Sequence, residues 1–81
     1  MARNTYWVEF EWNYEVDDRE AGGWVSDFDY DACRFNCLKK DIPKEVEKYV
    51  KEEMSHSFRL GEYRNLSIKI TDSYITTDDE F

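Results

Sequence analysis

Carboxylates are the residues of this chain whose number and spacing could do chemistry. They recur at alternate positions in two N-terminal stretches, as Glu9, Glu11 and Glu15 and as Asp27, Asp29 and Asp31. Clustered carboxylates can hold divalent cations for nuclease chemistry, or they can attract a basic partner by their field. The remaining residues decide between these two uses.

Metal binding finds little support in the spacing. The run from Asp27 resembles the start of an EF-hand calcium loop, but Ala32 stands where that loop needs glycine. Leu38 stands at the twelfth position, where the loop needs a bidentate glutamate. We therefore expect no metal and no cofactor. A metal-dependent nuclease that uses the strand carboxylates is an alternative, and it is disfavoured because an acidic surface repels a nucleic-acid substrate.

Other enzyme chemistry lacks its usual residues. His56 is the only histidine and has no evident base or orienting group beside it. Cys33 and Cys37 are predicted to be free, buried and inert, since no sequence context of a nucleophile accompanies them. Gly22 and Gly23 lack the rest of any phosphate-loop fingerprint. We expect that the protein is not an enzyme.

The charge of the chain is concentrated at its N-terminal end. The formal net charge is −8, and residues 1–31 contain nine acids and two bases. Residues 32–77 contain seven acids and nine bases, and the last residues add three acids. Direct nucleic-acid binding is disfavoured because phosphates need a basic surface, whereas a basic partner protein is favoured.

Two N-terminal strands are predicted to position the carboxylates. Residues 6–16 and 24–32 alternate with a period of two, which is typical of half-buried strands. The apolar phase of the first strand comprises Tyr6, Val8, Phe10, Trp12, Tyr14 and Val16, and that of the second comprises Trp24, Phe28, Tyr30 and Ala32. The loop 17–23 is expected to join them as a hairpin with one aromatic face and one face that carries all six carboxylates.

The pattern blurs after Tyr30, because Cys33, Phe35 and Cys37 are apolar in the opposite phase. Either a β-bulge flips the phase and the strand continues to about Leu38, or a short helix begins at Asp31. We favour an irregular segment or a short third strand here.

A helix and a last strand complete the pattern. Asp41 is placed to cap the helix, and Pro43 lies in its first turn, where a missing N–H is tolerated. Its apolar stripe is Ile42, Val46, Tyr49, Val50 and Met54. Residues 66–71 alternate again, with Leu66, Ile68 and Ile70 expected to point inward.

These elements predict one α+β domain over residues 1–81, with residues 1–5 and 78–81 frayed. A chain of 81 residues holds a single small core. We expect a ββαβ-type fold with an antiparallel sheet of three or four strands and one helix on its aromatic face. The expected core unites Tyr6, Phe10, Trp12, Phe28, Tyr30 and Ile68 with the helix stripe. No membrane span or signal sequence is evident, so a cytoplasmic protein is expected.

Trp7 lies in the acidic phase of the first strand, where it has no core to fill, so it is predicted to anchor a partner. The predicted partner-binding residues are Trp7, Glu9, Glu11, Glu15, Asp27, Asp29 and Asp31. In size and charge the chain resembles small acidic nucleic-acid mimics, including anti-restriction and anti-CRISPR proteins of phages and mobile elements. That resemblance implies an inhibitor that occupies the basic groove of a nucleic-acid-binding enzyme or effector, as a monomer or small homodimer. The alternative is a self-assembly module that uses the exposed edge of the last strand.

Overall fold

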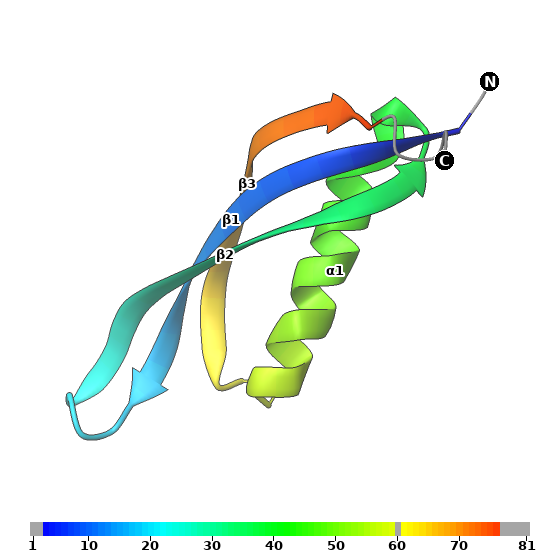
Figure 1. Cartoon of the computed structure of the whole chain (residues 1–81). Coiled ribbons are helices and arrows are strands. Elements are labelled where there is room, and N and C mark those ends of the chain that lie inside the picture. The colour runs from blue at the N-terminus through cyan, green and yellow to red at the C-terminus, as the bar shows by residue number, and fades with distance from the viewer. Residues whose placement is uncertain (1–2, 60, 77–81) are drawn as a thin grey trace.

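The computed structural model describes residues 3–59 and 61–76, which form one antiparallel sheet and one long helix (Figure 1). In chain order the elements are β1 (Asn4–Asp18), β2 (Gly23–Cys37), the short 3₁₀ helix η1 (Lys39–Asp41), α1 (Ile42–Ser57) and β3 (Tyr63–Ile75). The sheet has three strands in the order β2-β1-β3. The predicted α+β class, with an antiparallel sheet and a single helix, is confirmed.

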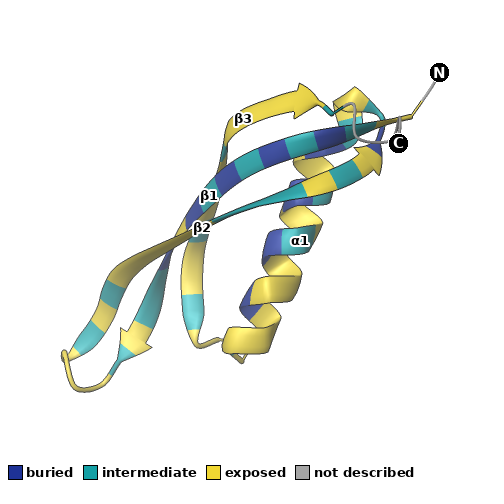
Figure 2. Ribbon diagram, in the orientation of Figure 1, coloured by how far each residue is buried: buried dark blue, intermediate teal, exposed yellow. Residues whose placement is uncertain are grey.

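β1 is the central strand, and its alternation builds the core. Its even positions Tyr6, Val8, Phe10, Trp12 and Tyr14 are all buried against α1. Figure 2 shows this as regular dark bands along β1, whereas β2 is largely exposed. The strand begins at Asn4, so Asn4 and Thr5 are part of the sheet and not of a frayed terminus. Residues 1–2 and 78–81, also predicted to be frayed, lie outside the described residues.

The register between β1 and β2 overturns the predicted faces of the hairpin. Glu11 lies opposite Tyr30 and Tyr14 lies opposite Asp27, so each even residue of β1 faces an odd residue of β2. Residues directly opposite each other share a face of the sheet. Phe28 and Tyr30 therefore lie on the face away from α1, where they are 62% and 74% exposed, and their predicted place in the core is wrong.

β2 is also more regular than the sequence indicated. Its pairing with β1 runs from Gly23 to Cys37 without a register shift, so neither a bulge nor a helix interrupts residues 31–37. The prediction of an irregular segment or short third strand is wrong. Because Phe35 lies opposite Tyr6 and Cys33 lies opposite Val8, the late apolar phase of β2 is the one that faces the core.

α1 covers only part of the sheet. Ile42, Val46, Val50 and Met54 are buried, and Tyr49 packs beside them, so the predicted stripe is confirmed. Asp41 precedes the helix, but its side chain makes no capping hydrogen bond. Figure 1 shows that the hairpin tip extends well beyond the helix, in a molecule that measures 52 × 20 × 18 Å. Within the described residues no helix is long and apolar enough to cross a membrane.

β3 forms the second edge of the sheet. Leu66, Ile68 and Ile70 are half-buried and pack against the core, as predicted. The strand is longer than the predicted residues 66–71, and its pairing with β1 shifts register twice. Between these shifts, Ile68 lies opposite Trp12 and Ile70 opposite Phe10.

The faces on which Phe10 and Phe28 lie predict that their substitution by alanine changes the free energy of unfolding by very different amounts. We expect Phe10→Ala to lower the free energy of unfolding by about 3–5 kcal/mol, because Phe10 is fully buried. The matched variant Phe28→Ala should change it by less than about 0.5 kcal/mol, since the ring is exposed. Urea denaturation followed by circular dichroism measures both, and a loss at Phe28 equal to that at Phe10 would contradict the register.

Candidate functional site

The six carboxylates of the hairpin fall into two groups on different faces. We call the face of the sheet that points away from α1 the outer face, and it carries Glu9, Glu11 and Glu15. Opposite them on β2 lie Ala32, Tyr30 and Ser26, which share that face. The expectation that Asp27, Asp29 and Asp31 stand on the same face as the glutamates is therefore wrong.

These three aspartates, here called the acid row, lie along the free edge of β2. Each Oδ1 accepts a hydrogen bond from the backbone N–H of the next residue, at 2.8 Å for Phe28, 2.9 Å for Tyr30 and 2.7 Å for Ala32. In an antiparallel ladder the N–H groups of alternate residues point away from the neighbouring strand. The acid row thus binds donors that the edge of the sheet would otherwise present.

Two tyrosines of the core border the acid row. The Tyr49 hydroxyl donates to Asp31 Oδ2 at 2.5 Å, and this hydrogen bond, helped by burial, raises the pKa of Tyr49. Burial also raises the pKa of Tyr14, with further contributions from the carboxylates of Asp27 and Asp29. The acid row therefore already accepts hydrogen bonds within the fold, from backbone N–H groups and from the Tyr49 hydroxyl.

Trp7 lies on the outer face, as predicted, but it is only half-exposed. Its indole Nε1 donates to Glu9 Oε2 at 3.1 Å, and the guanidinium of Arg34 lies 5.8 Å from the ring centroid. On the other side, Tyr74 of β3 lies directly opposite Trp7 and is 51% exposed. Trp7 and Tyr74 therefore form a pair of aromatic residues on the outer face, with Arg34 of β2 on the other side of Trp7.

Glu15 is held by residues of β3. Its Oε1 accepts hydrogen bonds from Arg64 Nε at 2.9 Å and from Asn65 Nδ2 at 2.6 Å, and these bonds lower the pKa of Glu15. The Arg64 guanidinium also lies 4.1 Å from the ring centroid of Trp24. Arginine, tryptophan and carboxylate already associate here within the chain itself.

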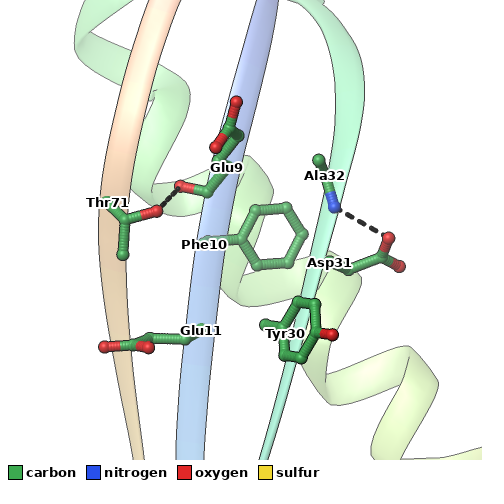
Figure 3. Close-up of a pocket in the computed structure, with 7 residues that line it drawn as sticks. All are labelled: Glu9, Phe10, Glu11, Tyr30, Asp31, Ala32 and Thr71. Atoms are coloured by element: carbon green, nitrogen blue, oxygen red, sulfur yellow. Dashed lines mark hydrogen bonds between the residues drawn. The ribbon is translucent and has the colours of Figure 1, made fainter.

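The centre of the outer face is an open hollow of about 460 Å³. Figure 3 shows that Glu9 and Glu11 extend from β1, with the Glu11 carboxylate directed toward β3, and that the Tyr30 ring stands on β2 on the other side of β1. Ala32 leaves space next to the ring, and Thr71 of β3 closes the far side while its hydroxyl donates to the Glu9 carbonyl at 3.1 Å. A planar cation could stack on the ring and pair with a carboxylate here.

Cys33 and Cys37 are free thiols, of which Cys37 is buried as predicted and Cys33 is only half-buried. Burial raises the thiol pKa values of Cys33 and Cys37, and nearby carboxylates add to the effect. A high pKa leaves little thiolate at neutral pH. Among residues 3–59 and 61–76, no three or more His, Cys, Asp or Glu side chains are grouped so as to hold a metal ion.

Comparison of the chain with protein-family models, curated proteins and solved structures gave no match.

The sequence prediction missed the aromatic half of this site. The alternation predicts that Tyr30, Phe28 and Trp24 face the core, but they lie on the same outer face as the glutamates. The signal that could have placed them was present in Cys33, Phe35 and Cys37, because an uninterrupted strand that buries these residues must expose its even positions.

The Tyr49 hydrogen bond predicts a pH-dependent difference between two variants. At neutral pH we expect Tyr49→Phe to destabilise the fold by about 1 kcal/mol, because it removes a bond to a charged acceptor that is partly exposed. Since the folded-state pKa of Tyr49 is raised, this stabilisation is complete below about pH 10 and is lost as the pH rises further.

Urea denaturation between neutral and alkaline pH measures this difference, with Tyr30→Phe as the control for loss of an exposed tyrosine hydroxyl. The gap in unfolding free energy between the wild type and Tyr49→Phe should narrow above about pH 10. A gap that stays constant over this range would contradict the assigned role of the bond.

Proposed function

We propose that this chain is a small acidic binding protein whose outer face engages a basic, arginine-bearing surface of a partner protein. The observation that carries the proposal is the pairing of Tyr30, which is 74% exposed, with Glu11 directly opposite it. Large exposed aromatics next to carboxylates complement arginine, which stacks on rings and forms bidentate bonds with carboxylates.

The arrangement of charge supports a local site more than a uniform negative field. Arg64 forms a salt bridge with Glu15, and Lys69 lies opposite Glu11, so the outer face carries positive as well as negative charges. Glu9 lies opposite Asp72, and two carboxylates in this position repel each other unless a cation comes between them. A partner arginine in the central hollow would relieve that repulsion.

The class of partner follows from the same chemistry. Protein surfaces that concentrate arginine and lysine are typical of nucleic-acid-binding proteins, because phosphate contact requires them. We propose that the partner is a nucleic-acid-binding enzyme or effector and that the chain inhibits it by covering this surface. The acid row at the edge of β2 adds attraction at long range, which raises the rate of association.

An arginine-rich peptide tests the recognition chemistry directly, with binding followed by tryptophan fluorescence. We expect the double variant Glu9→Gln/Glu11→Gln to bind about 10- to 100-fold more weakly than the wild type, because it removes the charged acceptors of the hollow. The control Glu20→Gln/Glu52→Gln removes the same charge from exposed positions elsewhere and should change affinity only about twofold. Equal losses in both double variants would show that only net charge matters.

The partner itself is tested by capture from a host lysate at low salt. Wild-type bait should retain a basic protein that a salt step releases, and the Glu9→Gln/Glu11→Gln bait should not. Added duplex nucleic acid should compete with the bait for the purified partner. Simultaneous binding of bait and nucleic acid would contradict the inhibitor role while leaving the arginine site intact.

A further inference from the structure

The two edges of the sheet differ in how many of their backbone N–H groups are bound by aspartate side chains. On the β2 edge, the acid row accepts the outward N–H groups of Phe28, Tyr30 and Ala32. Such side-chain bonds block the addition of another strand, since a free edge is a template for pairing. Strand addition is therefore disfavoured on the β2 side.

On the β3 edge the same kind of bond lies near the end of the strand, where Asp72 Oδ1 accepts the N–H of Ser73 at 2.9 Å. Because the even residues of β2 direct their N–H groups outward, the odd residues of β1 opposite them direct their backbone toward β3. Lys69 pairs with Glu11 in this way, so the N–H and carbonyl groups of Ile68 and Ile70 point to the free edge. Beside them, a groove of about 410 Å³ is lined by Leu66 and Ile68 and by Glu47 and Lys51 of α1.

We infer that a second copy of this chain pairs with the β3 edge, antiparallel and about a two-fold axis at Ile68. In this register each Ile68 lies opposite the other, and Leu66 lies opposite the second copy's Ile70. Ser67 then lies opposite Lys69, so between the two register shifts of β3 no like charges lie opposite each other. The strand is thus complementary to itself, as a closed two-fold interface requires.

Neighbouring registers lack this complementarity. An axis at Ile70 would place Ile68 opposite Asp72, and an axis at Leu66 would place Ile68 opposite Arg64. Both also run past a register shift of β3, between Ile70 and Asp72 or between Arg64 and Ser67. A shift by one residue would turn the apolar side chains to the outer face. The self-complementary register is therefore the one centred on Ile68.

The dimer leaves the proposed arginine site free. Pairing joins two three-stranded sheets edge to edge, with both helices on one face and both outer faces on the other. The interface uses the free edge of β3 and the groove beside α1, whereas the proposed arginine site lies over β1 and β2 and is bordered by Thr71 of β3. Failure of one proposal therefore does not entail failure of the other.

Charge changes at Ser67 test the interface without touching the core, because Ser67 is exposed and lies opposite Asn13 within the chain. Ser67→Glu should tighten the dimer and Ser67→Lys should weaken it, each by about 2- to 30-fold in dissociation constant, since each two-fold dimer contains two contacts with Lys69. Sedimentation equilibrium over a range of concentrations measures these constants. A protein that stays monomeric throughout, or a dimer that responds equally to both substitutions, overturns the inference.

Oxidative cross-linking tests the register in a Cys33→Ser/Cys37→Ala background, which removes the native thiols. Ile68→Cys should form a disulfide-linked dimer, because its Cα atoms lie about 5.5 Å apart in a hydrogen-bonded pair. Ile70→Cys should not cross-link alone, but it should do so when mixed with Leu66→Cys. Cross-linking of Ile70→Cys alone, or none at Ile68→Cys in a protein that sediments as a dimer, overturns the register.

Discussion

The pairing register of β1 with β2 determines which side chains this protein presents to its surroundings. The two strands are joined by a four-residue loop, Arg19–Gly22. In an antiparallel hairpin, a loop with an even number of residues always sets even positions opposite odd ones. Since opposed residues share a face, this parity buries Phe10 and places Tyr30 beside Glu11 on the outer face.

The limited part of the sheet that α1 covers makes this outcome possible. α1 buries the even positions of β1 and the last residues of β2, but the long hairpin continues past it. Asp27 and Asp29 share a face with the core, yet they remain exposed because no helix covers them. Aspartates that would be costly under a helix are tolerated there, and they bind the backbone donors of the β2 edge instead.

The strength of the sequence pattern explains what could be predicted. The even positions of β1 and the apolar stripe of α1 repeat often enough to fix one buried face each, and the structure confirms both. For β2, the phase of Trp24, Phe28 and Tyr30 competes with that of Cys33, Phe35 and Cys37, and composition favours the larger aromatic group. Which phase of β2 faces the core depends on the length of the hairpin loop and on how far α1 extends along the sheet. Neither is evident from the alternation of β2 alone.

The candidate site differs from the predicted one for the same reason. Trp7, Glu9, Glu11 and Glu15 could be placed together from the sequence, because they lie on one strand with a period of two. The face on which the acid row lies depends on the phase of the second strand. The exposure of the aromatics of β2 could not be predicted from the general rule that such residues are buried. The outer face is therefore an aromatic surface with carboxylates and some cations, instead of a flat anionic array.

The hairpin register is tested most directly by nuclear Overhauser contacts between Hα atoms of β1 and β2. Residues opposed in a non-hydrogen-bonded pair have Cα atoms only about 4.5 Å apart. We predict Hα–Hα contacts between Glu11 and Tyr30 and between Asn13 and Phe28. Contacts of Glu11 with Asp29 or Asp31 in their place would put the acid row on the outer face and contradict the account.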